Sequence, residues 1–235
     1  MKIILLSPDK KITVNTHGAY VEKFTYEDKM IFFPNVQIKI GEELKARGGM
    51  HPCIANFGKD NKTGEKQHGF GRYADWNVLE NTRDYLKLGV NGIGNYEKVY
   101  FTIEYHLNDT FNTHLKIENK SNRLVPVAPG FHPYFFSSDN FVHVKDRKID
   151  LSKIEDTIFL DRDSVEFFTS EGNFVVKGNR NISKYAIWSD KKGDYVCIEP
   201  TYNGNSFEDL YKKPKQLAPN EVFEMDFDIV VKEII

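Results

Sequence analysis

The period of the hydrophobic pattern is the feature that most constrains the fold of this chain. In the segment 222–231 every second residue is apolar: Phe223, Met225, Phe227, Ile229 and Val231. The residues between them are mostly acidic. A period of two is typical of a β-strand with one buried and one wet face, because successive side chains point to opposite sides of a sheet. The segment therefore predicts a half-buried strand and excludes an amphipathic helix.

The same alternation recurs along the chain. Segments 98–106 and 113–117 predict an antiparallel pair joined by a turn at Asn108. Further strands are expected at 11–14, 20–24, 30–33, 36–40, 174–177, 185–188 and 195–198. Turn signals recur about every ten residues, the rhythm of a sandwich or barrel. Helix is scarce, with one turn expected at 206–211. No linker or repeat divides the chain, so residues 1–235 are expected to form a single all-β domain.

Charge and cysteine content restrict the possible partners and the compartment. The 32 basic and 34 acidic residues nearly cancel, which argues against binding to nucleic acid or to an anionic membrane. No apolar run approaches the roughly 20 residues that a membrane helix needs. The apolar run Ile3–Leu6 is too short for the core of a signal peptide. Cys53 and Cys197 do not form a disulfide framework, which predicts a reducing, cytoplasmic location.

The longest irregular stretch is 46–77, and long loops in compact β domains often carry function. It contains Gln67–Arg72 (QHGFGR), in which two glycines flank a phenylalanine. Glycine lets a ligand approach the main chain closely. The donors of His68 and Arg72 therefore suit an oxygen-rich ligand. Arg72 could instead pair with a local acid such as Asp75.

Two further segments carry candidate chemistry. His132 lies in a segment rich in proline and glycine, where Pro133 biases it to an extended conformation. Glu199 follows the predicted strand 195–198 and shares a face with Cys197. A carboxylate at the end of an apolar strand is placed where burial can shift its pKa. The alternative for Glu199 is an ordinary exposed residue at a strand end.

The seven histidines show no metal-binding pattern in the sequence. No two of them have the i, i+2 or i, i+4 spacing of common metal sites, and neither cysteine has a partner nearby in the sequence. His106 and His114 fall on the polar faces of their strands and are expected at the solvated surface. A spatial cluster of His51, His68, His132 and Glu199 remains conceivable but is disfavoured. Phosphate-binding loops of the Walker or dinucleotide type are absent as well, so we expect neither a metal nor a cofactor.

Four segments, taken in order, resemble the aldose 1-epimerase (mutarotase) family. They are Arg47–Pro52 (RGGMHP), Gln67–Arg72 (QHGFGR), His132–Phe135 (HPYF) and Cys197–Pro200 (CIEP). Their wording is most similar to the branch of hexose-6-phosphate mutarotases and lactose-operon mutarotase-like proteins. The resemblance implies a large antiparallel β-sandwich of the galactose-mutarotase type, with sugar bound in an open groove.

The resemblance also implies roles for individual residues. Glu199 matches the general base of the family and His132 its general acid, while Arg47 and His68 match positions that contact the sugar. In the hexose-6-phosphate branch an arginine at the place of Arg72 helps to bind the phosphate. The implied activity is the interconversion of α and β anomers of a hexose or hexose 6-phosphate, without metal or cofactor. A small sugar is the expected partner of a monomer or weak homodimer.

Some expectations remain open at the level of sequence. The chain is short for the family, which predicts reduced loops around the groove. No motif identifies the aspartate that many members use to hold a sugar hydroxyl, although Asp190 and Asp161 are candidates. One alternative is a non-catalytic carbohydrate-binding protein on the same fold, and another is a cupin-like metal protein. Retention of both Glu199 and His132 favours the enzyme over a simple binder.

Overall fold

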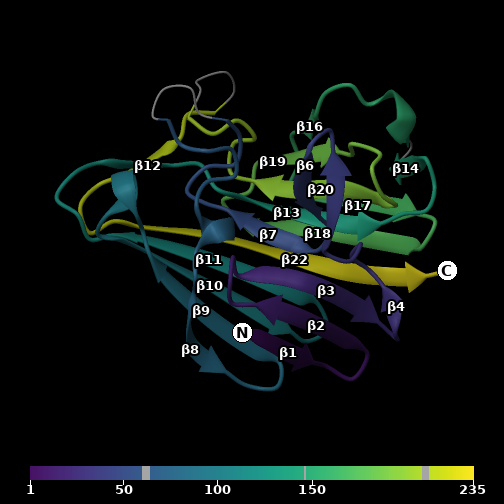
Figure 1. Ribbon diagram of the computed structural model, residues 1–235, viewed down its shortest axis with the longest axis horizontal. Coiled ribbons are helices and arrows are strands. Elements are labelled where there is room, and N and C mark those ends of the chain that lie inside the picture. Colours follow the sequence, from purple (N-terminus) through teal and green to yellow (C-terminus); the bar gives the residue numbers. More distant parts are fainter. Residues whose placement is uncertain (60–63, 146, 208–211) are drawn as a thin grey trace.

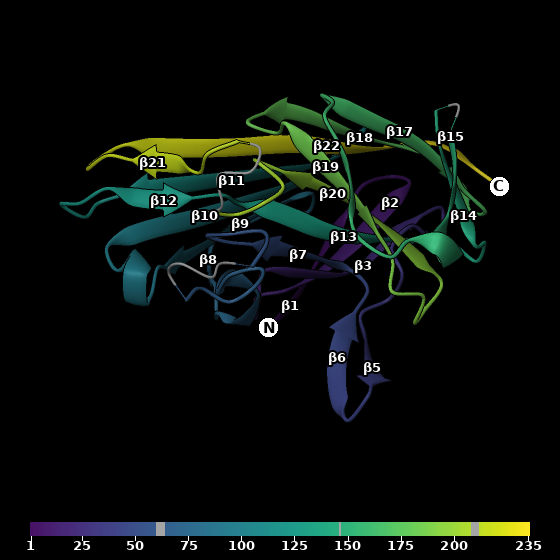
Figure 2. The same cartoon turned by 90° about the horizontal axis from the view of Figure 1, so that it is seen from above.

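Two large antiparallel sheets, seen in Figures 1 and 2, make up most of the computed structural model, which describes residues 1–59, 64–145, 147–207 and 212–235. The first sheet has the order β1 (Lys2–Leu6), β2 (Lys10–Asn15), β3 (Tyr20–Tyr26), β7 (Met50–Cys53), β13 (Gly130–Phe136), β20 (Tyr195–Thr201), β19 (Lys184–Trp188) and β16 (Ile158–Leu160). The short strand β4 (Lys29–Met30) pairs with β3.

The second sheet has the order β15 (Arg147–Asp150), β14 (Phe141–Val144), β17 (Ser164–Thr169), β18 (Gly172–Arg180), β22 (Val222–Ile234), β11 (Phe111–Asn119), β10 (Val99–Leu107), β9 (Tyr85–Asn91) and β8 (Asn77–Asn81). Two small ribbons pair β5 (Val36–Ile40) with β6 (Glu43–Arg47), and β12 (Val125–Val127) with β21 (Lys215–Leu217). Helical structure in the described residues consists of the 3₁₀ turns η1 (Gly71–Tyr73), η2 (Gly94–Tyr96) and η3 (Leu151–Lys153). None of these helices is long or apolar enough to cross a membrane.

Aromatic side chains fill the space between the sheets. The rings of Phe24 and Phe111 have centroids 5.4 Å apart, and those of Phe135 and Phe167 are 4.8 Å apart. In each of these pairs the first ring comes from the first sheet and the second ring from the second sheet. Large rings of this kind bury much apolar area and prefer such tilted or edge-to-face arrangements. The all-β sandwich expected from the sequence is therefore confirmed.

Alternation in the sequence corresponds to alternation in burial. Along β22, Phe223, Met225 and Phe227 are buried while the acidic residues between them are only partly covered. Strands β10 and β11 form the expected antiparallel pair, with Tyr105 opposite Thr113. The period-two reading of both regions is confirmed.

Two expectations need correction, and a third concerns residues that lie mostly outside the described part of the chain. Segment 30–33 was expected as a strand, but the strand assignment ends at Met30. The stretch 46–77 was expected to be irregular, yet it contains β7, because residues 50–53 pair with β13 far along the sequence. In the sequence alone, the glycines and proline of this stretch are typical of a loop, and only the pairing with β13 reveals the strand. The helical turn expected at 206–211 lies mostly outside the described residues.

The ribbon β5–β6 projects from the body of the sandwich, as Figure 2 shows. Two glycines with positive φ, Gly48 (98°) and Gly49 (66°), join it to β7. A Cβ atom at Gly48 would lie 2.1 Å from the carbonyl oxygen of Pro34, and one at Gly49 would lie 2.3 Å from that of Val21. Only glycine allows this close passage. The chain therefore leaves the ribbon at Arg47 and enters the centre of the first sheet directly.

Candidate active site

Three neighbouring strands of the first sheet place a row of polar side chains on one face. His51 on β7 pairs directly with His132 on β13. The pairing of β13 with β20 sets Tyr134 opposite Cys197, which puts His132 across from Glu199 two residues further along. Residues opposite each other in adjacent strands share a face. The sheet itself therefore brings His51, His132 and Glu199 together.

The His132–Glu199 pair is buried and short of hydrogen-bond partners. His132 Nε2 lies 3.5 Å from Glu199 Oε2, and both residues are buried. Neither Glu199 Oε2 nor His132 Nδ1 has a hydrogen-bond partner among the described residues. Buried polar atoms are usually satisfied, so two orphans on adjacent side chains mark a place where a ligand can supply the missing bonds.

The loop before η1 delivers His68 to the same cluster. His68 has a φ of 67° and is followed by Gly69, whose added Cβ would lie 1.9 Å from the carbonyl oxygen of Ile54. The rings of His68 and His132 have centroids 5.1 Å apart, and those of His51 and His132 are 5.0 Å apart. The tight backbone of this loop therefore holds His68 beside the buried pair.

Burial controls the protonation of these groups. It raises the pKa of Glu199 well above its ordinary value. Burial also lowers the pKa of His132 well below its ordinary value, and the nearby His68 and Arg72 lower it further. Burial, together with the charges of Arg72 and Arg47, lowers the pKa of His68 to about 3. Desolvation favours the uncharged form of each group, so a single proton shared by Glu199 and His132 resides on Glu199.

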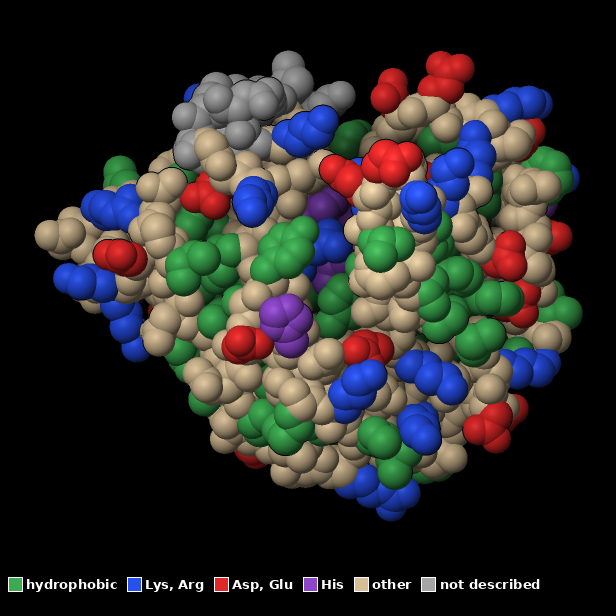
Figure 3. All heavy atoms as spheres, in the orientation of Figure 1, with side chains coloured by type: hydrophobic (Ala, Val, Ile, Leu, Met, Phe, Trp, Pro, Cys, Tyr) green, Lys and Arg blue, Asp and Glu red, His purple; other side chains and the backbone are tan. Residues whose placement is uncertain are grey.

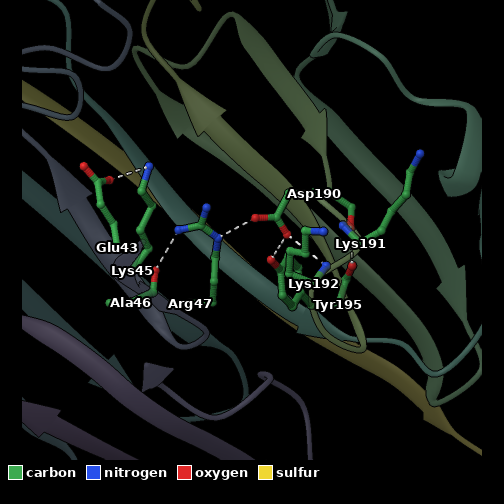
Figure 4. Close-up of polar contacts among 9 residues, drawn as sticks. Glu43, Lys45, Ala46, Arg47, Asp190, Lys191, Lys192 and Tyr195 are labelled. Carbon is green, nitrogen blue, oxygen red and sulfur yellow. Dashed lines mark hydrogen bonds and ion pairs between the residues drawn. The ribbon is translucent and has the colours of Figure 1, made fainter. Parts of the chain in front are cut away.

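A salt bridge anchors Arg47 at the side of the site, as Figure 4 shows. Arg47 Nε donates to Asp190 Oδ2 at 2.8 Å, and its Nη1 donates to the carbonyl oxygen of Ala46 at 3.0 Å. The Tyr195 hydroxyl donates to the other oxygen of Asp190. The guanidinium carbon lies 5.5 Å from the Trp188 ring centroid. These contacts fix the side chain of Arg47, the last residue of the projecting ribbon β5–β6.

The two aspartates considered for binding a sugar hydroxyl are both engaged elsewhere. Asp190 accepts from Arg47 and Tyr195, so it supports an arginine of the site. Asp161 is largely exposed and accepts a hydrogen bond from Lys184. The structure does not bring either carboxylate to the His132–Glu199 pair as an unpaired acceptor.

The cluster lies in a cleft of about 910 Å³. Its lining includes Arg47, His68, Arg72, His132, Trp188 and Glu199. Figure 3 shows a hollow in the surface where histidine and basic side chains are visible. The five residues to which the resemblance gave a role, Arg47, His68, Arg72, His132 and Glu199, therefore border the same cleft.

Arg72 does not form the ion pair considered as its alternative. Asp75 instead contacts His17, with Oδ1 and Nδ1 2.7 Å apart. The Arg72 guanidinium carbon lies 5.2 Å from the Tyr73 ring centroid. Across the part of the chain that the structure describes, no carboxylate forms an ion pair with Arg72.

Comparison with known proteins identifies the family. A family model described as aldose 1-epimerase matches residues 3–191. The chain belongs to the aldose 1-epimerase family. The matched part of the chain includes Arg47, His68, Arg72 and His132 but ends before Glu199. No curated protein sequence matches the chain.

Solved structures with the same fold are distant in sequence. A galactose mutarotase related enzyme from Lactobacillus acidophilus superimposes with a TM-score of 0.81 at 18% identity, over 99% of this chain and 98% of that one. A galactose mutarotase-like protein from Lactobacillus casei gives a TM-score of 0.79 at 13% identity, over 98% of this chain and 100% of that one. At these identities the likeness shows the fold alone.

Several residues at the site of this aldose 1-epimerase family member escaped the sequence analysis. The Tyr134 ring stacks on His132 with centroids 4.6 Å apart and an interplanar angle of 14°. Cys197 lies with His132 and Glu199, and Cys53 Sγ lies 3.4 Å from His68 Nδ1. Neither cysteine has a partner nearby in the sequence, but in the folded chain both lie beside histidines. Alternation along the strands could have found Tyr134, which is two residues from His132.

Proposed function

We propose that this member of the aldose 1-epimerase family interconverts the α and β anomers of a hexose or hexose 6-phosphate. The observation that carries the proposal is the buried His132–Glu199 pair, 3.5 Å apart, at a cleft large enough for a sugar. Each residue of this pair has a buried polar atom, His132 Nδ1 or Glu199 Oε2, without a hydrogen-bond partner among the described residues. A binding protein has no need for a buried acid and base without partners of their own.

Opening the sugar ring requires two proton movements. The C1 hydroxyl proton must leave, and the ring oxygen must gain a proton as the C1–O5 bond breaks. With Glu199 as carboxylate and His132 as imidazolium, Glu199 takes the first proton and His132 supplies the second. The products are the open-chain aldehyde, a protonated Glu199 and a neutral His132. After rotation about C1–C2, closure reverses both transfers on the other face of the aldehyde.

When the sugar is open, the pair is uncharged, with a protonated Glu199 and a neutral His132, and burial favours this form. When the sugar ring is closed, the pair is ionic, with the same single proton on His132. Burial therefore stabilises the intermediate side of the reaction relative to the ring side. Polar sugar hydroxyls that enter the cleft favour the ionic form before ring opening. Each of the two proton transfers is worth on the order of 10² to 10⁴ in rate.

Arg47 and His68 are proposed to orient the sugar. Arg47 is fixed by Asp190 and by stacking near Trp188, so its guanidinium loses little freedom when it binds a hydroxyl. His68 stands on a strained loop next to His132. Both side chains border the cleft that also contains His132 and Glu199. A sugar ring in this cleft can therefore contact the orienting groups and the acid–base pair at the same time.

Arg72 is proposed to bind the phosphate of a hexose 6-phosphate. It borders the cleft and has no carboxylate ion pair among the described residues. The planar fork of arginine matches the geometry of a phosphate. Its charge also lowers the pKa values of the neighbouring histidines, which places it within electrostatic reach of the acid–base pair.

Anomer exchange measured by NMR tests the activity. Freshly dissolved α-glucose, galactose and glucose 6-phosphate are each followed with and without catalytic amounts of the protein. We expect exchange to be accelerated for at least one of them. Saturable sugar binding without any acceleration would instead support the carbohydrate-binding alternative.

The phosphate role is tested with Arg72→Ala against Arg83→Ala, which removes an exposed arginine at the turn between β8 and β9. Loss of a charged hydrogen bond should lower kcat/KM for glucose 6-phosphate by about 10- to 100-fold. Exchange of an unphosphorylated sugar should change little in either variant. An equal loss of kcat/KM in Arg72→Ala for phosphorylated and unphosphorylated sugars would contradict a role of Arg72 in phosphate binding.

A further inference from the structure

Donor atoms of three kinds converge beneath the cleft. Ligand atoms of His132, Cys197 and Glu199 all lie within 4.8 Å of one another, and the three residues are buried. We infer that this triad forms a binding site for Zn²⁺ or a similar thiophilic divalent cation. Because His132 and Glu199 also form the proposed acid–base pair, an ion bound there would block anomer exchange. Only this inhibitory consequence rests on the proposed function.

The geometry of the triad is close to that of a zinc site. Zn²⁺ holds sulfur at about 2.3 Å and nitrogen or oxygen at about 2.0 Å in a tetrahedron, so its ligand atoms lie about 3.3 to 3.6 Å apart. The 3.5 Å between His132 Nε2 and Glu199 Oε2 already matches that separation. The 4.8 Å limit on all three distances means that small side-chain rotations suffice for Cys197.

The three donors make a neutral complex with a divalent ion. One thiolate and one carboxylate balance the charge of Zn²⁺, and a neutral imidazole adds none. A buried site needs such a balance, because an uncompensated charge away from water is very costly. The sulfur and nitrogen donors also select a thiophilic ion over Mg²⁺ or Ca²⁺, which prefer several oxygen ligands.

A second observation points to a ligand at this place. Glu199 Oε2 is buried and has no hydrogen-bond partner among the described residues. His132 and Glu199 border the cleft, which provides a path for the ion. The fourth corner of the tetrahedron would face the cleft and be filled by water or by a sugar hydroxyl. That open corner distinguishes the site from a closed structural zinc site.

Metal binding by the full-length protein, stripped with a chelator beforehand, provides the primary test. Zn²⁺ affinity is measured by competition with a chromogenic chelator, and Co²⁺ is used as a spectroscopic probe. We expect one ion per chain and a thiolate-to-cobalt charge-transfer band in the near ultraviolet. A Co²⁺ spectrum without that band would overturn the inference, even if no variant could be made.

Two cysteine variants locate the ligand. Cys197→Ser should abolish the charge-transfer band and weaken Zn²⁺ binding by at least about 10- to 100-fold, since even outer partners of metal ligands are worth that much. Cys53→Ser is the matched control, because Cys53 is also a buried free cysteine but lies outside the triad. Equal affinities in the two variants would contradict the assignment.

Inhibition is tested separately by adding Zn²⁺ to anomer-exchange assays and comparing each protein with its own metal-free rate. Wild type and Cys53→Ser should be inhibited in parallel with Zn²⁺ binding, and Cys197→Ser should need correspondingly more Zn²⁺. Zinc bound with the thiolate signature in a protein that exchanges no sugar would refute the proposed function but leave the metal site standing. Exchange that persists in the zinc-saturated protein would refute the inhibition.

Discussion

Two histidine–glutamate pairs of nearly equal length lie on different sheets of this protein. His132 Nε2 and Glu199 Oε2 are 3.5 Å apart in the first sheet, and His114 Nε2 and Glu224 Oε1 are 3.6 Å apart in the second. The side chains of the first pair are 6% and 3% exposed, whereas those of the second are 23% and 31% exposed. Glu224 also contacts Arg180, while Glu199 Oε2 has no hydrogen-bond partner in the described part of the chain.

The comparison shows that distance alone does not make a catalytic pair. Solvent and Arg180 satisfy the pair on the second sheet, and such exposed contacts are worth about 0 to 1 kcal/mol. Burial in the first sheet removes that competition, raises the pKa of Glu199 and lowers that of His132. Protons can then move between the pair and a bound sugar with little change in net charge.

The largest difference between the pairs should appear when their histidines are replaced. His132→Gln should lower kcat for anomer exchange by about 10² to 10⁴, because it removes one of the two proton-transfer groups. His114→Gln removes a partly exposed imidazole of the other sheet and should leave kcat nearly unchanged. Steady-state rates on the best substrate check both values. Similar losses in the two variants would mean that the buried pair has no special role.

The next largest effect is expected at Asp190, which holds Arg47 beside the buried pair. Asp190→Asn weakens the salt bridge that holds Arg47, so KM should rise by about tenfold, the effect of losing one charged hydrogen bond, while kcat falls much less. Asp194→Asn alters an exposed carboxylate of the same β19–β20 connection and serves as the control. A loss confined to kcat would indicate that Asp190 acts on the chemistry and not through Arg47.

Burial should also give Glu199 a stability signature. Its pKa is raised in the folded state above an ordinary value of 4.5, so its favourable contribution is complete below that pH and is lost as pH rises toward the folded pKa. Glu199→Gln has no proton to lose and should gain stability relative to wild type by about 1.4 kcal/mol per pH unit in that window. Urea unfolding at several pH values measures the difference. A difference independent of pH would show that Glu199 is not desolvated.

The smallest expected effect is a difference between two histidine titrations. Burial lowers the pKa of both His132 and His114, but much further for His132. NMR of the imidazole protons across the acid range should therefore show His114 titrating first as pH falls. Titration of His132 at or above the pH of His114 would show that burial does not lower the pKa of His132 further than that of His114.

Local patterns in the sequence predicted the fold well. Alternation along 222–231 and 98–106 was enough to predict strands and their buried faces. In a strand, residues two positions apart point to the same face of the sheet, so the apolar residues mark the buried face. The same rule predicted that Cys197 and Glu199 share a face. Local patterns also singled out the loop that carries His68 and Arg72, since its glycines are needed for a tight backbone.

Contacts between distant segments could not be predicted in this way. Strand β7 is recognisable only through its pairing with β13. The Arg47–Asp190 and His17–Asp75 pairs join residues far apart in the sequence, and nothing local specifies either partner. The unusual protonation of Glu199 follows from burial by several strands. These features are properties of the assembled sheet and not of any one segment.

The most direct test of the buried pair compares Glu199→Gln with Glu224→Gln in the anomer-exchange assay. Both changes replace a carboxylate beside a histidine with an isosteric amide, one at the cleft and one on the other sheet. We expect Glu199→Gln to lower kcat by about 10² to 10⁴ and Glu224→Gln to leave it nearly unchanged. Undiminished exchange by folded Glu199→Gln would contradict the assignment of Glu199 as the base.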